Sequence, residues 1–453
     1  MFYKHYVTTF SHGVNSKKMI LKKKLLYLFS TIALIPIFAL PAFANASNTK
    51  LKNGVSVIFD NDPSSLLTAI QIWVAVGSVD EDAINSGISH YIEHTIFKGT
   101  KTRGQKDVAP EIERLGGVIN AATSKDYTFF YTLVPSSYCL KAFEILGDVV
   151  LNPAFPETEI EKERQVVLEE VKRKDDNPQS QLFDEFYEQV YQQSPYARRV
   201  IGTEETVSKL KREDLLAFHN KFYVSGNIFV VITGNFAKKE MMDLIESNFG
   251  ALPKVKKEKN KSVMLKPKNK KDLAKKIIKR DVSQGYILMG FTAAPADSSE
   301  QYSLDVASYI LGAGRASRLN KKLVEKTKLA LNISCSFSTQ RGPGLFHIYG
   351  ECNPEKVSNL SNSILLELLD LSINQVTEEE LNRAKVLLIR DKLLEAQTSD
   401  GKAGELGFYA VLGIEKISDN YVKKIKEVEI KDIKKVISKY LVFPNIPTVI
   451  MAP

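Results

Sequence analysis

The chain has 453 residues, which is too long for one ordinary hydrophobic core and favours two domains of roughly 200 residues each. Hydrophobic residues make up 44% and charged residues 25% of the chain, a composition that excludes a disordered or fibrous protein. The formal net charge is +9, but the basic residues gather in two segments, so this value does not describe the chain as a whole.

The first segment, residues 1–44, has the composition of a secretory signal peptide. It contains six lysines and no acidic residue, so the rest of the chain carries a net charge of only +3. Lys22 to Lys24 precede an apolar run from Leu25 to Leu40, and Ala42-Phe43-Ala44 matches an A-x-A cleavage site. We therefore expect an exported protein, with the bacterial periplasm favoured over secretion. An uncleaved membrane anchor is the alternative, although the run is short for a span and contains Pro36.

Residues 45–252 are predicted to form the first of two domains. The apolar periodicity predicts, in chain order, a strand at 68–76, an acidic turn at 80–82, helices at 83–97 and 108–115, strands at 118–123 and 127–134, a long helix at 157–173 and a strand at 228–233. Gly116-Gly117 separates the second helix from the strand that follows it.

A lysine-rich stretch, residues 253–280, follows and is predicted to be a solvated linker. From Lys254 to Arg280 there are 13 Lys or Arg residues against two acidic residues, Glu258 and Asp272. Aromatic side chains that could stack on bases are almost absent there, so no nucleic-acid partner is expected. Docking of this stretch to an acidic partner or to a membrane surface is the alternative.

Residues 281–453 repeat the order of elements of the first domain. We expect, in chain order, a strand at 286–291, a turn at 296–299, helices at 301–311 and 317–326, strands at 331–337 and 344–351, and a long helix at 378–395. Repetition at this scale indicates an α+β fold made of two homologous domains joined by the lysine-rich stretch.

The three cysteines, Cys139, Cys335 and Cys352, have no C-x-x-C spacing and cannot form a disulfide framework. Buried small residues are the favoured interpretation. A disulfide between Cys335 and Cys352, which fall in successive predicted strands, is the alternative in an oxidising compartment.

Two of the four histidines that follow residue 44 lie in the sequence His90-Tyr91-Ile92-Glu93-His94. On a helix, residues i and i+4 lie on one face one turn apart, so both imidazoles can reach one tetrahedral Zn²⁺. Glu93 projects toward the same face, where a carboxylate can accept a proton from an attacking water without binding the metal. The pattern predicts one Zn²⁺ per chain held by His90 and His94, with Glu93 as the base and a third ligand from elsewhere in the chain.

The H-x-x-E-H order, with Gly87-Ile88-Ser89 before it and Phe97-Lys98-Gly99-Thr100 after it, resembles the pitrilysin/insulinase family of zinc peptidases. Within that family the chain is most similar to the branch of the mitochondrial processing peptidases, from about Leu51 to the C-terminus. The resemblance implies a zinc metalloendopeptidase. It also implies two homologous domains, each a mostly antiparallel sheet packed with helices, that together form half of a clamshell.

In this family the third zinc ligand is a glutamate on a helix with the pattern E-x(6)-E. The stretch from Glu163 to Glu170 fits this pattern, and Glu170 lies 76 residues after His94. Seven residues are nearly two helical turns, so Glu163 and Glu170 share a face while Glu169 points about 100° away. The resemblance therefore implies that Glu170 is the third ligand and that Glu163 orients a ligand or the water. A solvated surface acid is the alternative for Glu163.

The stretch from Gly116 to Thr123 resembles the family's active-site edge strand, which binds an extended peptide through backbone hydrogen bonds. By this resemblance Asn120 and Ala121 would contact the substrate, with Asn120 facing the scissile bond. An ordinary turn or strand asparagine is the alternative. His219 and His347 are expected to be surface or packing histidines rather than ligands.

The second domain contains no H-x-x-E-H sequence, and the resemblance points to a further difference there. Active single-chain members and some partner subunits carry an arginine and a tyrosine seven residues apart, which hold the substrate carbonyl as charge develops on it. The corresponding positions here are Val324 and Leu331. We therefore expect a homologous partner subunit that supplies the pair. A heterodimer is favoured, and a homodimer is the alternative.

The leading hypothesis is an endopeptidase that hydrolyses extended or unfolded peptides outside the cytoplasm. One alternative is a non-catalytic or chaperone-like subunit of a peptidase complex, although such subunits typically lose motif residues that this chain keeps. Another alternative is a membrane-tethered binding module, which requires that the N-terminal segment is retained. About one bound zinc per chain would favour the enzyme over both alternatives.

Overall fold

The computed structural model describes residues 46–104, 107–255, 275–374, 376–415, 420–441 and 446–453. All of these residues belong to one compact unit. The predicted signal peptide and residues 256–274 of the predicted linker lie outside the described residues. Within them, no helix combines the length and the apolar character that crossing a bilayer requires.

The first sheet has six strands in the order β1-β2-β6-β3-β5-β4. Only the β2–β6 pair is parallel, and the other neighbours are antiparallel. The strands are β1 (Ser47–Lys50), β2 (Ser56–Asn61), β3 (Leu67–Val74), β4 (Val118–Thr123), β5 (Thr128–Pro135) and β6 (Ile228–Gly234). Strand β4 therefore lies at an edge of the sheet, as the resemblance implied for this segment.

The second sheet repeats this arrangement with five strands in the order β7-β11-β8-β10-β9. Its parallel pair is β7–β11, and the remaining pairs are antiparallel. The strands are β7 (Lys276–Lys279), β8 (Gly285–Ala293), β9 (Asn332–Ser338), β10 (Gly344–Cys352) and β11 (Thr448–Ala452). Strands β2 to β6 thus correspond one by one to strands β7 to β11, which confirms the predicted fold class of two mostly antiparallel sheets packed with helices.

Strand β7 differs from the prediction, because residues 276–279 fall in the stretch assigned to the linker. The sequence Lys276-Ile277-Ile278-Lys279 pairs in parallel with β11, and its backbone hydrogen bonds hold it at the edge of the sheet. Lysine is common on edge strands, where its charge discourages pairing with other chains. Lysine content alone therefore did not distinguish this edge strand from a linker.

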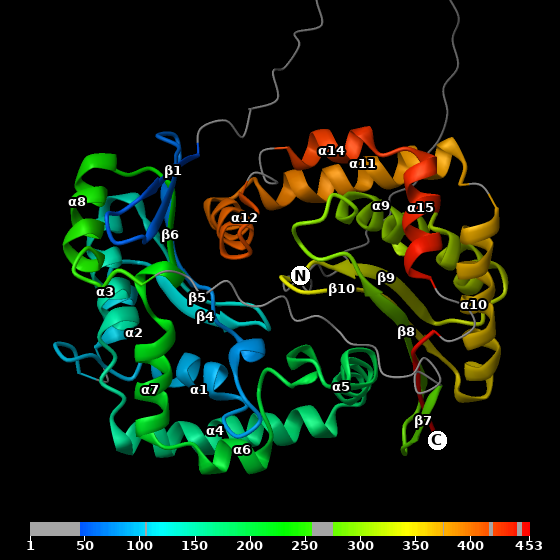
Figure 1. Ribbon diagram of the computed structural model, residues 1–453, viewed down its shortest axis with the longest axis horizontal. Coiled ribbons are helices and arrows are strands. Elements are labelled where there is room, and N and C mark those ends of the chain that lie inside the picture. Colours follow the sequence, from blue (N-terminus) through cyan, green and yellow to red (C-terminus); the bar gives the residue numbers. More distant parts are fainter. Residues whose placement is uncertain (1–45, 105–106, 256–274, 375, 416–419, 442–445) are drawn as a thin grey trace, which may run out of the picture. The chain divides into compact units, whose positions relative to one another are not determined.

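Helices flank both sheets (Figure 1). In the first half they are α1 (Ile88–Thr95), α2 (Val108–Arg114), α3 (Cys139–Leu151), α4 (Glu157–Asp176), α5 (Pro178–Tyr191), α6 (Glu204–Lys209), α7 (Arg212–Phe222) and α8 (Lys238–Phe249). In the second half they are α9 (Gln301–Gly312), α10 (Val357–Ile373), α11 (Glu378–Glu395), α12 (Ser399–Val411), α14 (Tyr421–Glu427) and α15 (Ile430–Tyr440). The predicted helix at 317–326 corresponds to a π-helical segment, Asn320–Lys326.

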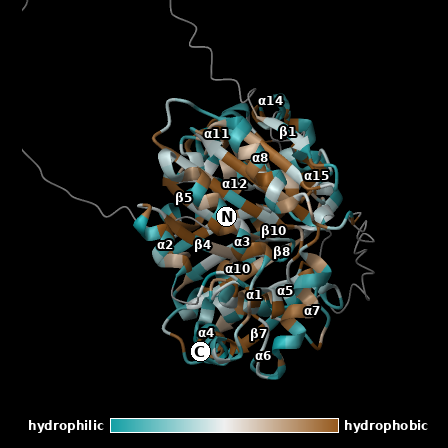
Figure 2. Cartoon of the chain, turned by 90° about the vertical axis from the view of Figure 1, so that its left-hand side faces the viewer, coloured by the Kyte–Doolittle hydropathy of each residue, from teal (hydrophilic) through white to brown (hydrophobic). Residues whose placement is uncertain are grey.

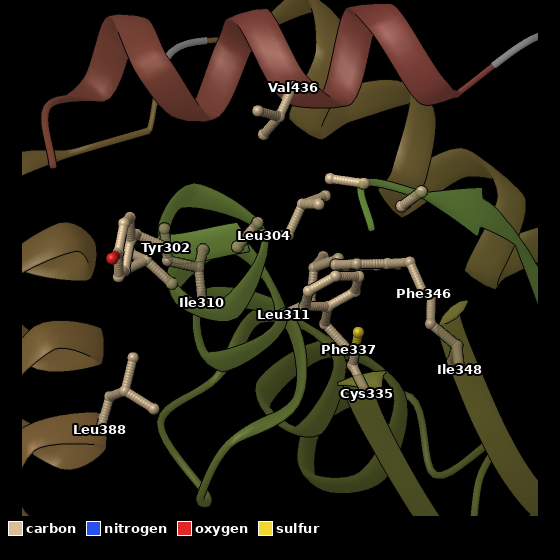
Figure 3. Close-up of a cluster of buried hydrophobic side chains, with 14 of the residues drawn as sticks. Tyr302, Leu304, Ile310, Leu311, Cys335, Phe337, Phe346, Ile348, Leu388 and Val436 are labelled. Atoms are coloured by element: carbon tan, nitrogen blue, oxygen red, sulfur yellow. The ribbon is translucent and has the colours of Figure 1, made fainter. Parts of the chain in front are cut away.

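Each sheet buries one face against helices of its own half. In the second half, Leu304 and Ile310 of α9, Leu388 of α11 and Val436 of α15 meet Phe346 of β10 in one apolar cluster (Figure 3). Hydrophobic colour is strong on inner elements such as β5, whereas outer helices such as α6 and α14 carry more hydrophilic colour (Figure 2). An apolar interior beneath more hydrophilic outer helices is the pattern expected of helices packed on a sheet.

The opposite face of each sheet is covered by a helix from the other half. Helix α12 of the second half packs on β3 and β6 of the first sheet, where Gln71 donates from Nε2 to Oδ1 of Asp400 over 2.9 Å. Helix α5 of the first half packs on β8 and β11, where Leu182 and Phe186 join Val449 in a shared apolar cluster. Because of this exchange, each half buries one face of the other half's sheet.

Helix α1 is shorter than the predicted helix from Ala83 to Phe97. Asp82 accepts hydrogen bonds at Oδ1 from the backbone N–H groups of Ile84 and Asn85, which makes a local turn in place of a helical one. Gly87 then adopts a φ of +95°, a left-handed conformation that ordinary residues avoid. The helix begins directly after it, at Ile88.

All three cysteines are free and buried, which confirms the favoured interpretation, and the alternative disulfide between Cys335 and Cys352 is wrong. On the paired strands β9 and β10, Cys335 lies opposite Ile348 and Cys352 lies beyond the paired residues. Burial raises the pKa of the Cys352 thiol to about 11, so this thiol is not a ready nucleophile at neutral pH.

Candidate metal centre

The two histidines of the H-x-x-E-H sequence lie one turn apart on α1, with their ring centroids 4.6 Å apart. Helix α1 packs on α4, the helix that carries Glu163 and Glu170. Tyr91 of α1 is fully buried and donates from its hydroxyl to the carbonyl oxygen of Ile160 on α4 over 2.5 Å. This contact fixes the two helices against each other and so fixes the distance between the histidines and the acids.

The structure brings His90, His94 and Glu170 together, with one ligand atom from each within 4.8 Å of the others. Nε2 of His90 lies 3.7 Å and Nε2 of His94 lies 3.5 Å from Oε2 of Glu170. Two zinc bonds of about 2.1 Å at the tetrahedral angle would separate their donor atoms by about 3.4 Å. The spacing and the donor types therefore fit a Zn²⁺ ion, with the fourth position of the tetrahedron left to a non-protein ligand.

Glu163 lies beside the histidine rather than among the donors. Its Oε2 is 3.3 Å from Nδ1 of His94, and its Oε1 is 2.6 Å from Nζ of Lys98. A carboxylate on the second ring nitrogen fixes the orientation and the tautomer of a metal-binding histidine. His90 differs, because its Nδ1 is buried without a hydrogen-bond partner in the part of the chain that the structure describes.

Glu93 is placed by a residue of the edge strand. Oγ1 of Thr123, the last residue of β4, donates to Oε2 of Glu93 over 2.5 Å. Burial raises the pKa of Glu93, and the hydrogen bond from Thr123 opposes this rise without cancelling it. The result is a carboxylate that is more basic than an exposed one and that lies at the end of an exposed strand edge.

The charges of the two histidines differ even though the rings are adjacent. Burial, and next to it the neighbouring His94, lower the pKa of His90 to about 4, so His90 is neutral and offers a lone pair at neutral pH. Burial also opposes charge on His94, but the carboxylates of Glu170, Glu93 and Glu163 outweigh it and raise the pKa of His94. A hydrogen bond from His94 is the main reason why the pKa of Glu170 is lowered.

The N-terminus of α1 is held by a buried acid. Glu81 accepts hydrogen bonds from the backbone N–H of Gly87 over 2.8 Å and from that of Ser89 over 2.9 Å. A carboxylate at this end of a helix satisfies N–H groups that have no partner within the helix and interacts favourably with the helix dipole. Glu81 thus supports the helix that carries both histidines.

The other predicted site residues lie along or away from this cluster. Asn120 is exposed on β4, and its Oδ1 accepts from the backbone N–H of the buried Ala121. His219 is buried, stacks on Tyr223 and contacts the carbonyl oxygen of Val150 at 2.8 Å through Nε2. His347 lies on β10 of the second sheet. His347 also contacts the ring of Phe183, so His219 and His347 are packing residues rather than ligands, as predicted.

Sequence reasoning missed three residues that support the site, namely Thr123, Lys98 and Glu81. Thr123 was recognised only as the end of a predicted strand, and Lys98 only as part of a matching stretch. Glu81 was recognised only as part of an acidic turn. The one signal available was the position of that turn just before a histidine-bearing helix that has no other acid near its start.

Comparison with known proteins identifies the family. Residues 56–204 match the model described as Insulinase (Peptidase family M16), and residues 209–388 match the model described as Peptidase M16 inactive domain. An uncharacterized zinc protease of Rickettsia felis is 33% identical over 406 residues, which cover 89% of this chain and 96% of that protein. The mitochondrial-processing peptidase subunit beta of Blastocladiella emersonii is 28% identical over 415 residues, 89% of this chain and 88% of that protein.

The fold agrees with these matches. A protease from Helicobacter pylori has a similar structure, with a TM-score of 0.84 and 25% sequence identity over 90% of this chain and 99% of the other. The class that the fold and the cluster define is a zinc-protease-like protein of two homologous halves. The chain belongs to peptidase family M16, which confirms the resemblance stated from the sequence.

Proposed function

We propose that this protein is a zinc-dependent endopeptidase that hydrolyses extended or unfolded peptides outside the cytoplasm, together with a homologous subunit. The observation that carries the proposal is the convergence of His90, His94 and Glu170, with Glu93 beside them. Several similar proteins bear the name zinc protease, which supports the same class of reaction.

The roles of the residues follow from their placement. His90, His94 and Glu170 would hold the zinc ion, which polarises the scissile carbonyl and makes water a stronger nucleophile. Glu93 accepts a proton from the attacking water and then donates it to the departing amine. Thr123 orients Glu93 through its hydroxyl, and Glu163 orients His94.

Strand β4 is the proposed binding edge for the substrate. Among the described residues it has a hydrogen-bonded neighbour, β5, on one side only, and its last residue contacts Glu93. A peptide that extends the sheet along β4 would therefore run to the site with its backbone paired, past the exposed Asn120. This mode requires an extended segment, which folded proteins rarely offer, and it depends little on side chains.

A second subunit would complete the transition-state stabilisation. Val324 lies in the π-helical segment and Leu331 just before β9, at the positions where the resemblance implies an arginine and a tyrosine. Neither aliphatic side chain can donate a hydrogen bond to a developing oxyanion. We expect the partner to supply these donors in a heterodimer, and hydrolysis by the isolated chain at the rate of the mixed subunits would contradict this.

Export is proposed from the sequence of residues 1–44, with the periplasm as the compartment. N-terminal sequencing of the native protein tests it, and a mature N-terminus near residue 45 is the expected result. A retained segment in the membrane fraction would instead support the anchored form.

The decisive variant for the reaction is Glu93→Gln, which keeps the shape of the side chain and removes the base. It should retain about one zinc per chain and lower kcat by roughly 10²- to 10⁴-fold, the usual contribution of a general base. Hydrolysis of an unstructured fluorogenic peptide and metal analysis on the same sample measure both. Unchanged turnover in the variant would remove Glu93 from the mechanism, and zinc-free wild-type protein would remove the proposed function.

A further inference from the structure

The loop between β9 and β10 of the second half reaches the first half at Asp80 and Asp126. Arg341 in this loop places Nη2 3.0 Å from Oδ2 and 3.1 Å from Oδ1 of Asp80. Its Nε lies 3.4 Å from Oδ1 of Asp126, and its backbone N–H donates to Oδ2 of Asp126 over 3.0 Å. One arginine of the second half thus joins two acids of the first half.

Two tyrosines of the first half fix the position of this loop. The hydroxyl of Tyr196 donates to Oδ1 of Asp126 over 2.5 Å and accepts from the backbone N–H of Gly342 over 2.7 Å. The hydroxyl of Tyr191 donates to the carbonyl oxygen of Pro343 over 2.8 Å. These contacts hold the loop backbone in place, so the guanidinium is delivered by a fixed segment.

Asp80 belongs to a segment that supports α1. Its neighbour Glu81 accepts the two hydrogen bonds from the start of α1, at Gly87 and Ser89. Adjacent residues cannot move independently, so the anchoring of Asp80 also fixes the acid that caps the histidine-bearing helix.

Asp126 belongs to the turn that follows Thr123, the residue that orients Glu93. A hydrogen bond from the backbone N–H of Ser124 to the carbonyl oxygen of Tyr127 closes this turn over 2.8 Å. The backbone N–H of Val79 in turn donates to the carbonyl oxygen of Lys125 over 3.0 Å. The two supporting segments therefore touch, and Arg341 spans both.

The two acids are buried, so their stability as charged groups depends on Arg341. Asp80 has 9% and Asp126 has 4% of its side chain exposed, against 17% for Arg341. Burial raises the pKa of Asp80, and Arg341 opposes the rise. Without a cation between them, two buried carboxylates would repel each other and each would lose a charge-assisted partner.

We propose that Arg341 is a positioning residue for the reaction, through which the half without a metal site holds α1 and the Glu93–Thr123 pair in register. The proposal rests on the proposed peptidase function. It assigns to the β9–β10 loop a role in setting the geometry of the metal donors and of the base, at a site to which it contributes no ligand.

Arg341→Met tests the proposal, with Arg318→Met as the matched control. Arg318 is also mostly buried between two acids, Glu380 at 2.6 Å and Asp370 at 3.2 Å, but all three lie in the second half. Both variants are measured in the complex in which the wild type is active. The readouts are kcat and KM for an unstructured peptide, the melting temperature, and the visible absorption spectrum after replacement of zinc by Co²⁺.

We expect Arg341→Met to lower kcat by on the order of 10- to 100-fold, as small displacements of catalytic groups do, and to change the Co²⁺ spectrum. Both variants should lower the melting temperature by similar amounts. Arg318→Met should leave kcat and the Co²⁺ spectrum near wild type. Equal effects of both variants on kcat and spectrum would overturn the proposal.

Two further results keep the outcome clear. If Arg341→Met does not fold, Asp80→Asn takes its place, because it removes one charge at constant shape. It should lower kcat and alter the Co²⁺ spectrum as expected for Arg341→Met. A wild-type spectrum and kcat in Asp80→Asn would overturn the proposal. A wild type without zinc-dependent hydrolysis would refute the proposed function itself. An active wild type whose Arg341 variants have unchanged kcat and Co²⁺ spectra would refute only the positioning role.

Discussion

Corresponding pairs of helices pack in both halves, yet in the described part of the chain only the pair of the first half carries a candidate set of metal ligands. In the first half α1 packs on α4, and their interface contains His90, His94 and Glu170. In the second half α9 packs on α11, and the corresponding interface is apolar around Leu388. Its hydrogen bonds run from the hydroxyl of Tyr309 to Asp391 over 2.8 Å and from the guanidinium of Arg383 to backbone carbonyl oxygens of α9. Figure 3 shows the apolar side chains of α9 and α11 directed into the core.

The fold and the proposed metal site depend on different features of the sequence. Apart from the additional edge strand β1, both sheets keep the same strand order and the same parallel pair, because backbone pairing and apolar faces suffice to specify them. The candidate metal centre depends instead on a few polar side chains at one helix interface. A duplicated fold can therefore keep its architecture in both halves and its chemistry in one.

The strongest test of this difference replaces the acid at the α1–α4 interface. Glu170→Gln removes a charged donor and should weaken zinc binding by at least about 100-fold, since even residues that only support a ligand cost 10- to 100-fold. Peptide hydrolysis should fall with zinc occupancy. Glu169→Gln is the control, because Glu169 is the exposed neighbour on the same helix. Competition with a zinc-chelating dye measures both affinities, and equal values would contradict the assignment.

Glu163→Gln tests whether Glu163 supports the proposed zinc site by orienting His94. The amide can still approach Nδ1 of His94, but it has no charge to pair with Lys98 or to strengthen the hydrogen bond with the imidazole. We expect zinc affinity to fall by about 10- to 100-fold with the stoichiometry unchanged. The same dye competition measures it. Wild-type affinity would show that Glu163 does not support the proposed metal site.

The exchange of helices between the halves can be tested on α12. A Cβ added at Gly407 would lie 2.1 Å from Nε1 of Trp73 on β3, so Gly407→Ala should destabilise the protein by about 1–3 kcal/mol through overpacking. Gly404, on the same helix, has nothing within 4 Å of an added Cβ, so Gly404→Ala should stabilise by roughly 0.5–1 kcal/mol. Urea unfolding distinguishes the signs, and equal effects would argue against this packing.

A smaller effect is expected from a buried acid of the second half. Burial raises the pKa of Asp305 to about 7, and the hydrogen bond from the hydroxyl of Tyr421 opposes the rise. The folded state thus keeps a proton that the unfolded state releases above its ordinary pKa near 4. This contribution to stability is complete below about pH 4 and is lost as the pH rises through 7.

Asp305→Asn removes that titration. The free energy of unfolding of the wild type should therefore fall relative to that of Asp305→Asn between pH 5 and pH 8. Urea unfolding of both proteins at the two pH values measures the difference. If the two proteins keep a constant difference, Asp305 does not hold the proton.

Much of this molecule follows from sequence pattern, and the exceptions have physical causes. Helix 378–395 and strand 118–123 match α11 and β4, because a capping box at Thr377 and Glu380 and a break at Gly116-Gly117 mark their starts locally. The spacing of the H-x-x-E-H sequence put His90 and His94 on one face by helical geometry alone. The position of Glu170 was inferred from the resemblance, since no local pattern links two helices so far apart in the chain.

The contacts that could not be predicted join distant segments. Strand β7 was assigned to the linker, because an edge strand rich in lysine has no apolar alternation of its own. Helix α1 was predicted to start too early, since the turn at Asp82 competes with helix through its side chain. The contacts of Arg341 and of α12 with the first half depend on how the halves pack, which neither periodicity nor composition encodes.

The central claim is that one zinc ion lies between His90, His94 and Glu170. Anomalous X-ray diffraction at the zinc absorption edge, on crystals of the mature protein loaded with one equivalent of zinc, tests it most directly. We predict a single strong peak about 2 Å from Nε2 of both histidines and from a carboxylate oxygen of Glu170. A zinc-loaded protein whose peak lies elsewhere, with these three side chains free of metal, would contradict the account.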